Sequence, residues 1–154
     1  MSSRMLAVHW IVVAVLGSAC RSEPAPATSA LQFIPLPGSA DLPFSAAVRA
    51  GPMLYLSGQL GTDSAGRLVP GGIGPETAQA LANIRALLEA QGSGMDRVVK
   101  CTAMLADIAE WGAMNREYVQ HFPSRRPARS AFAASGLALG ARIELECLAL
   151  AGRD

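Results

Sequence analysis

Three charged side chains in apolar, strand-like surroundings are the strongest candidates for chemistry in this sequence. Arg129 begins one strand-like run, and Glu144 and Glu146 lie two residues apart in another, which places both carboxylates on one face of that strand. A guanidinium can bind a substrate carboxylate through two parallel hydrogen bonds, and a nearby glutamate can hold or deprotonate a water molecule. A structural ion pair between Arg129 and one of the glutamates explains the same pattern equally well.

The other polar residues in apolar surroundings carry weaker signals. Ser57 and Gly58 end a strand-like run, where backbone N–H groups could face an oxyanion, although glycine at a strand end is common. Asn115 lies in an apolar stretch of a predicted helix, where an asparagine on the helix surface is the ordinary interpretation. His121, near the end of that helix, is interpreted as a charge that favours the helix C-terminus rather than as a base.

Proline, glycine and apolar periodicity divide residues 31–151 into short elements. Apolar runs predict strands over 31–34, 44–49, 53–57, 97–105, 129–135 and 142–150, and the abundant glycines of 58–74 predict a loop. One helix is predicted to start at Gly74-Pro75 and to end before Gly92. A second helix is predicted to start with a capping box of Asp107 and Glu110 and to bury one apolar face, made of Ile108, Trp111, Met114, Tyr118 and Phe122.

This order of elements predicts a two-layer α+β domain, with two helices on one face of a mixed sheet. The other face of the sheet is left without a cover, and it is rich in apolar side chains. An uncovered apolar face of that size is typical of a protein that associates with itself.

Length and composition set the limits for these interpretations. The chain has 154 residues, of which 51% are hydrophobic and 16% charged, as expected for one domain with a sizeable core. From Cys20 onward it carries 12 basic and 12 acidic residues, and this balance argues against nucleic acid as the main partner. His9 and His121 are the only histidines, which argues against a histidine-rich metal site.

The first thirty residues have the layout of an export signal followed by a tether. Arg4 precedes an apolar run over 5–16 that is too short to span a membrane, and small residues then lead to Cys20. Residues 16–20 resemble the lipobox of bacterial lipoproteins, with Gly17 in place of the usual aliphatic residue, and an ordinary signal cut after Ala19 is the alternative. Residues 21–30 read as an extended tether. We therefore expect an exported bacterial protein, either periplasmic or held at the membrane by a lipid on Cys20.

Cys101 and Cys147 are the remaining cysteines, and both lie in apolar strand-like runs. An oxidising compartment would permit a disulfide between them. Buried free thiols that pack as small hydrophobic groups are the more common finding in such runs, and we expect two unpaired cysteines.

Several segments together resemble the Rid/YjgF superfamily. Residues 79–92 are similar to its helix motif Q-x-x-x-N-x-x-x-x-L-x-x-x-G, with Gln79, Asn83, Leu88 and Gly92 at the specified positions. The segments that match its other landmarks, in the same order, are Val98–Thr102, Met114–Tyr118, Pro127–Ser130 and Ile143–Glu146. The similarity extends over roughly residues 33–150.

This resemblance implies a chorismate-mutase-like α+β protomer that forms a homotrimer with inward-facing sheets and a site in each inter-subunit cleft. Active members hydrolyse 2-imino acids to 2-keto acids and ammonia, without a metal or cofactor. Arg129 falls on the family's carboxylate-binding arginine and Glu146 on its water-directing glutamate. Ser57, Gly58 and Asn115 fall on positions that line the cleft.

Two further cleft positions depart from the family pattern. Phe44 stands where the deaminating branch commonly has tyrosine, and Ala131 stands where it often has cysteine. The substitutions remove a hydroxyl and a thiol from the expected substrate-binding cleft, so substrate preference stays open.

Two functions follow as alternatives. The first is a metal-free imine hydrolase, in which Arg129 fixes the substrate carboxylate, Glu146 positions water and Gly58 stabilises developing charge. The second is a non-catalytic trimer of the cell envelope that binds small carboxylates through Arg129 alone. Only the first function uses Glu146, so this residue distinguishes the two. A nuclease, as some family members have been labelled, is disfavoured by the balanced charge.

Overall fold

The computed structural model describes residues 30–36 and 42–152. The predicted export signal, residues 1–20, lies outside the described residues, and so does the predicted tether apart from Ala30. In the part of the chain that the structure describes, no helix is long and apolar enough to cross a membrane.

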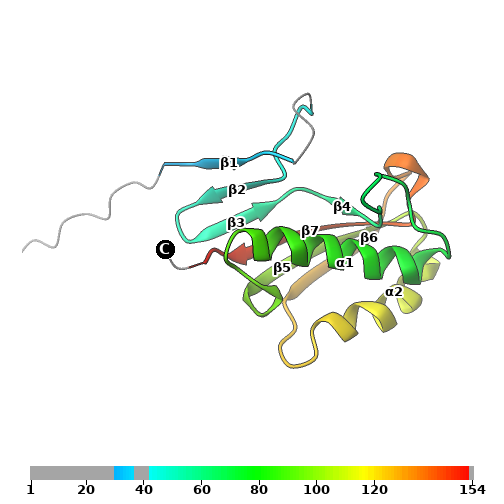
Figure 1. The fold of residues 1–154 in the computed structure, drawn as a ribbon. Coiled ribbons are helices and arrows are strands. Elements are labelled where there is room, and N and C mark those ends of the chain that lie inside the picture. Colours follow the sequence, from blue (N-terminus) through cyan, green and yellow to red (C-terminus); the bar gives the residue numbers. More distant parts are fainter. Residues whose placement is uncertain (1–29, 37–41, 153–154) are drawn as a thin grey trace, which may run out of the picture.

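The strands form one mixed sheet in the order β1-β2-β3-β7-β5-β6, with β4 also paired to β7 (Figure 1). Their bounds are β1 Gln32–Ile34, β2 Ala47–Ala50, β3 Met53–Leu56, β4 Gln59–Leu60, β5 Val98–Leu105, β6 Ala128–Ala133 and β7 Ile143–Leu150. Only β5 and β6 run parallel, and every other pairing is antiparallel. The predicted hairpin is confirmed, with Gly51 at a φ of 57° in the turn between β2 and β3.

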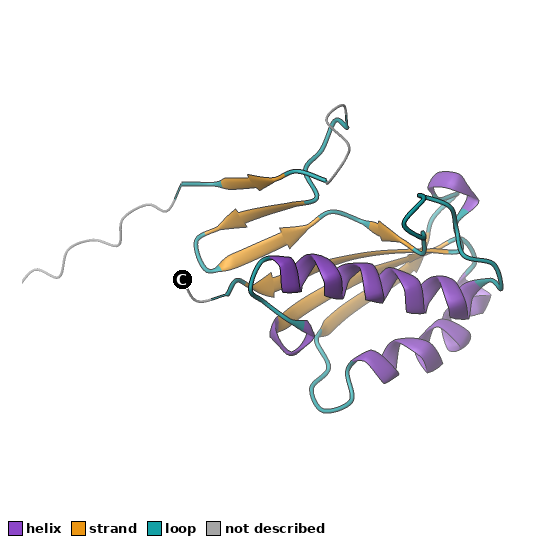
Figure 2. Ribbon diagram, in the orientation of Figure 1, coloured by secondary structure: helices purple, strands orange, loops and turns teal. Residues whose placement is uncertain are grey.

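Two α-helices, α1 over Ile73–Ala90 and α2 over Trp111–Tyr118, lie side by side on one face of this sheet (Figure 2). Short 3₁₀ turns complete the connections: η1 Met95–Arg97, η2 Ile108–Glu110, η3 Val119–His121 and η4 Ala138–Gly140. The predicted α+β class, with two helices and a mixed sheet, is confirmed.

The start of α1 differs slightly from the prediction. The helix begins at Ile73 rather than at Gly74-Pro75, because Gly72 adopts a φ of 79° and turns the chain into the helix. Pro75 is still in the first turn, where a backbone N–H would have no partner within the helix. Glu76 also lies in this turn, and its carboxylate accepts a hydrogen bond from the backbone N–H of Arg142 at 2.7 Å.

The region predicted as a loop over 58–74 contains β4, which corrects that prediction. Side chains of α1 hold this two-residue strand and the chain that follows it: Asn83 donates to the carbonyl oxygens of Leu60 and Thr62 at 3.1 and 3.0 Å. Gln79 in turn donates to the Asn83 amide oxygen at 2.9 Å. Gly61 allows the close approach, since an added Cβ would lie 2.5 Å from the Cα of Glu76. Local sequence does not reveal a strand that depends on a helix formed later in the chain.

The predicted capping box is only half formed. Asp107 accepts a hydrogen bond from the backbone N–H of Ala109 at 2.9 Å, as a cap should. The Glu110 carboxylate does not accept a hydrogen bond from the backbone N–H of Asp107, because it pairs with the Arg142 guanidinium at 2.8 Å. This hydrogen bond raises the pKa of Arg142. The apolar face is also shorter than predicted: Ile108 and Trp111 are 53% and 46% exposed, while the other three residues are buried.

The two faces of the sheet differ sharply in burial. Side chains of β5 and β7 that point toward the helices are almost fully buried; these are Cys101, Ala103, Leu105, Ile143, Leu145, Cys147 and Ala149. On the other face, called the open face here, Tyr55, Phe132 and Leu150 are 41–47% exposed. The uncovered apolar face predicted from the sequence is therefore present in the single chain.

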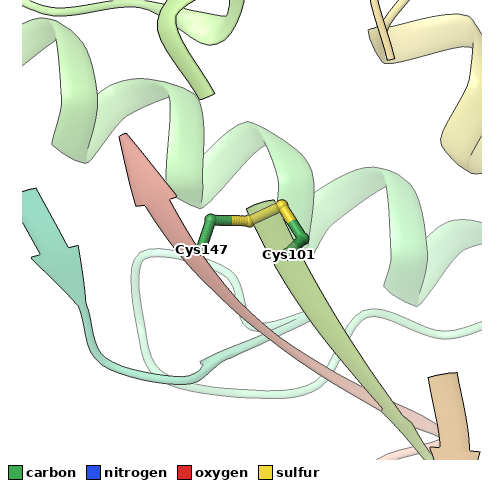
Figure 3. Close-up of a disulfide and its surroundings, with 2 residues drawn as sticks. All are labelled: Cys101 and Cys147. Carbon is green, nitrogen blue, oxygen red and sulfur yellow. A yellow bond between two sulfur atoms is a disulfide. The ribbon is translucent and has the colours of Figure 1, made fainter. Parts of the chain in front are cut away.

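Cys101 and Cys147 form a disulfide, which corrects the prediction of two free thiols (Figure 3). They are direct partners across β5 and β7, and both side chains point toward the helices. The pairing depends on the register of two strands that are 46 residues apart in the chain, and composition alone cannot supply that register.

Candidate active site

Arg129 lies on the edge strand β6 with its guanidinium against α2. Its Nη2 donates to the Asn115 amide oxygen at 2.5 Å, and its Nη1 lies 3.5 Å from the Met114 sulfur. The guanidinium carbon is 4.6 Å from the centre of the Tyr118 ring and 6.0 Å from that of Trp111. Asn115 thus contacts Arg129 directly, which neither its place in the helix nor its spacing indicates.

No carboxylate pairs with Arg129 among the residues that the structure describes. Glu144 and Glu146 lie on the open face, whereas Arg129 is in register with Cys101 and shares the face that the helices cover. The alternative of an Arg–Glu structural ion pair is therefore wrong within the described chain. A half-buried cation without an acidic partner has donors free for an anion from outside the protomer.

Glu144 lies directly against Gly58. A Cβ at Gly58 would overlap the Glu144 carboxylate, so the absence of a side chain at this position makes room for that group. Strand β4 brings the two residues together, because Leu60 pairs with Glu144 and Gln59 with Leu145 on β7. The signal in the sequence was the repeat of glutamate at 144 and 146, which does not say which of the two meets Gly58.

Glu146 lies elsewhere on the open face. It is exposed, pairs across the sheet with Thr102, and borders a hollow of about 360 Å³ that Tyr55, Lys100 and Leu148 also line. Its carboxylate has no hydrogen-bond partner among the described side chains and backbone groups. Glu146 is thus accessible, and the residues around it differ from those around Glu144.

Phe44 and Ser57 share a groove beside the first strands, and this groove has a volume of about 620 Å³. Phe44 is 54% exposed in it, next to Phe33, Leu42 and Val48. The Ser57 hydroxyl donates to the Ser45 carbonyl at 2.6 Å, which ties the end of β3 to the segment before β2. Ala131 lies on β6, two residues from Arg129 and on the same face.

The predicted site residues therefore fall into two groups. Arg129, Asn115 and Ala131 lie at the β6 edge, whereas Phe44, Ser57 and Gly58 lie near β2, β3 and β4, with Glu144 and Glu146 on β7. β3 is three strand spacings from β6, or about 14 Å, and β7 is two strand spacings from it, or about 10 Å. Glu144 and Glu146 also lie on the opposite face of the sheet from Arg129, so a substrate with a few heavy atoms cannot touch both groups within one chain.

Metal binding has no support in the described residues, which contain no cluster of three or more histidine, cysteine, aspartate or glutamate side chains that could hold an ion. His121 lies 3.3 Å from the Glu117 carboxylate, one turn earlier in the chain. It also lies in the last turn of η3, at the helix end where the sequence predicts it.

Comparisons with known proteins agree with this architecture. The family model described as Endoribonuclease L-PSP matches residues 35–151. A goat (Capra hircus) protein named 2-iminobutanoate/2-iminopropanoate deaminase is 47% identical over 111 residues, which cover 71% of this chain and 81% of the goat protein. The chain belongs to the Rid/YjgF superfamily.

Solved structures of Rid proteins have the same fold. A Rid family protein, YyfA from Yersinia pestis, is 34% identical, with a TM-score of 0.73 over 79% of this chain and 99% of that one. RidA from an Antarctic Psychrobacter is 31% identical, with a TM-score of 0.69 over 77% of this chain and 94% of that one. In the present Rid protein, Gln79 and Asn83 of the helix motif hold the β4 region and so place Gly58 beside β7.

Proposed function

We propose that this Rid protein is an imine deaminase. It would hydrolyse 2-imino acids: water adds to the imine carbon, the carbon–nitrogen bond breaks, and a 2-keto acid and ammonia leave. The goat relative carries the name of a deaminase of this kind, and the cationic Arg129 without an acidic partner is the observation that carries the proposal here. Uncatalysed imine hydrolysis is already fast, so orientation of substrate and water by these residues is sufficient, and we propose no metal or cofactor.

Arg129 binds the substrate carboxylate in this proposal. Two of its five N–H donors are directed at Asn115 and Met114, and the others can form a two-pronged contact with a carboxylate. The carboxylate would thereby fix the imine carbon at a set distance from the water that attacks it.

A glutamate of β7 holds that water. The sequence assigns the role to Glu146, but the contact with Gly58 supports Glu144, because Gly58 is the residue expected to stabilise developing charge. We therefore propose Glu144 as the residue that positions water and Glu146 as a neighbouring residue of the open face. Phe44 and Ser57 would line the same cleft.

The two groups of site residues would meet between protomers of a homotrimer. Arg129 is on the edge strand β6, where a second protomer can approach, and Gly58 and Glu144 are too far from it within one chain. A cleft formed by Arg129 of one protomer and Glu144 of the next resolves this separation.

The proposed activity is tested by measuring ammonia release from 2-imino acids that an amino acid oxidase generates in the assay. The wild-type protein should exceed the spontaneous rate. Arg129→Ala should reduce the gain about ten- to a hundredfold, because it removes a charge-assisted contact, and Arg129→Lys should restore little, because a point charge lacks the two-pronged geometry.

Glu144→Gln separates catalysis from mere binding, with Glu146→Gln as the matched control on the same strand. Glu144→Gln should lower turnover by about 10²-fold and still bind a 2-keto acid, because general-base assistance is lost and Arg129 is intact. Glu146→Gln should stay near the wild-type rate. A large loss in Glu146→Gln alone would return the role to Glu146, and a wild-type protein that binds keto acids without turnover would support the carboxylate-binding module.

We also propose that the protein acts outside the reducing cytoplasm, as a periplasmic or lipid-anchored protein. The buried Cys101–Cys147 disulfide supports this, because disulfides persist in oxidising compartments. Mass spectrometry of the native N-terminus tests it: a lipid on Cys20 indicates anchoring, and an unmodified N-terminus at that residue indicates plain secretion.

A further inference from the structure

The Tyr118 ring lies beneath the Arg129 guanidinium in a fixed position. Tyr118 is only 3% exposed, and its ring packs against Phe122 with 4.9 Å between centroids. The guanidinium carbon is 4.6 Å from the centre of the Tyr118 ring, within the range in which an aromatic face attracts a cation. The two residues come from different elements, α2 and β6, so the contact joins the helix layer to the edge of the sheet.

The Tyr118 hydroxyl does not explain why a tyrosine stands here. It is the buried side-chain oxygen that lacks a hydrogen-bond partner among the described residues. A buried hydroxyl without a partner is unfavourable compared with no hydroxyl at all. Within the described chain, Tyr118 therefore contacts Arg129 through its ring and not through its hydroxyl.

The Arg129 guanidinium needs support because the arginine side chain has several rotatable bonds. To bind a carboxylate with two hydrogen bonds, the guanidinium must be held in one plane. Asn115 holds one edge of the guanidinium through its amide oxygen, whereas the Tyr118 ring supports its face. Trp111 is 6.0 Å away and 46% exposed, at the outer limit of an effective contact.

We propose that Tyr118 is a positioning residue, whose ring holds the Arg129 guanidinium in the orientation that binds the carboxylate of the substrate. The inference rests on the proposed function, since it concerns the same carboxylate site. The affinity for 2-imino and 2-keto acids would then depend on the ring at position 118. The rate of the chemical step at the imine carbon would not depend on it.

Four proteins test the proposal: wild type, Tyr118→Leu, Tyr118→Phe and the matched control Phe122→Leu. Phe122 is equally buried, and the rings that contact Arg129 in the described chain are those of Trp111 and Tyr118, so Phe122→Leu loses a core aromatic ring but keeps the Tyr118 ring. The measurements are KM and kcat for imine hydrolysis, Kd for a 2-keto acid by calorimetry, and the thermal unfolding temperature.

Tyr118→Leu should raise KM and Kd about three- to thirtyfold, with kcat nearly unchanged, because a cation–aromatic contact is lost. Tyr118→Phe should restore the wild-type KM and unfold at a higher temperature. Phe122→Leu should unfold at a lower temperature with its KM unchanged. Equal KM values in Tyr118→Leu and Phe122→Leu would overturn the proposed role of the Tyr118 ring. A KM for Tyr118→Phe as high as that of Tyr118→Leu would also overturn it.

A second series decides the matter if Tyr118→Leu does not fold. Phenylalanines with increasing numbers of ring fluorines at position 118 keep the size of the ring and weaken its attraction for a cation. KM should rise with each added fluorine, and a KM independent of fluorination overturns the proposal. A wild-type protein with neither hydrolysis nor keto-acid binding would instead overturn the proposed function. The proposed role of the Tyr118 ring would then fall as well, because it rests on that function.

Discussion

Arg129 shows how a half-buried guanidinium can be held in place without an acidic partner. It is surrounded by an amide oxygen, a thioether and two aromatic rings instead of a carboxylate. Such partners stabilise a cation without neutralising it, whereas a salt bridge would occupy the donors that an incoming carboxylate needs. Burial disfavours a negative charge on the neighbouring Tyr118 phenol.

Tyr118 should make folding sensitive to alkaline pH. Burial raises its pKa to about 12, although the charge of Arg129 acts in the other direction, so the folded state favours the neutral phenol. The stability this provides is complete below the ordinary pKa of tyrosine near 10 and is lost as pH rises toward 12. The loss should reach about 1 kcal/mol by pH 11.

Urea unfolding of wild type and Tyr118→Phe at pH 8 and pH 11 measures this effect. Tyr118→Phe should lose less stability between the two pH values, because it has no phenol to ionise. Identical pH dependence in the two proteins would contradict the assignment to Tyr118.

At the scale of elements, β5 and β7 are the centre of the molecule. Together they place Cys101 beside Cys147 on the helix side and Thr102 beside Glu146 on the open side. Arg129 is in register with Cys101 on the next strand, so the disulfide and the guanidinium lie on one row across the sheet. A change in the register between β5 and β7 would therefore also change the position of Arg129 on β6 relative to β7.

Reduction of the disulfide should destabilise the protein. The bond closes a loop between cysteines 46 residues apart, and loss of such a constraint on the unfolded chain is expected to lower the free energy of unfolding by about 2–4 kcal/mol. Urea unfolding with and without dithiothreitol measures the difference.

The double variant Cys101→Ala, Cys147→Ala is the control for the reductant. It should be less stable than the oxidised wild type and insensitive to dithiothreitol. Alkylation of both Cys101 and Cys147 in the unfolded, unreduced wild-type protein would show instead that the bond does not form.

At the scale of the whole molecule, the open face of the sheet is the surface that a single chain leaves unfinished. Tyr55, Phe132 and Leu150 are exposed there, while the helices cover only the opposite face (Figure 2). Apolar side chains spread over a sheet face are stabilised when other copies cover them. The homotrimer we propose would bury this face, and it would also bring the two groups of site residues together.

Phe132→Glu should therefore disrupt the assembly. Phe132 is 47% exposed on the edge strand, and a glutamate there would carry an unpaired charge into the interface. Light scattering at micromolar concentration should show three chains per particle for the wild type and mostly single chains for Phe132→Glu, with imine hydrolysis lost together with the trimer.

Val119→Glu adds a charge on the helix side at a position that is 38% exposed, and it should remain trimeric. A wild-type protein that scatters light as a stable monomer would contradict the proposed assembly. So would full activity in a monomeric Phe132→Glu variant.

Local patterns in the sequence were enough for the elements with strong periodicity. The alternation from Ile143 to Leu150 predicted β7 with both glutamates on one face, and Leu81, Ile84 and Leu88 predicted the buried side of α1. Strand β4 was missed because two residues carry no period and their pairing relies on Asn83. The apolar spacing of Tyr118 indicated a core residue, which it is, but gave no sign of the cation above its ring.

By itself the sequence determined the fold class, the family and the set of side chains available for chemistry, because periodicity, punctuation and motif spacing are local properties of the chain. Only the tertiary structure decided which of these side chains meet. It joined Cys101 to Cys147, set Glu144 rather than Glu146 against Gly58, and put Arg129 on the opposite face from both glutamates. The physical reason is that strand register and face are fixed by pairing between distant segments, and a shift of one residue would exchange the two faces.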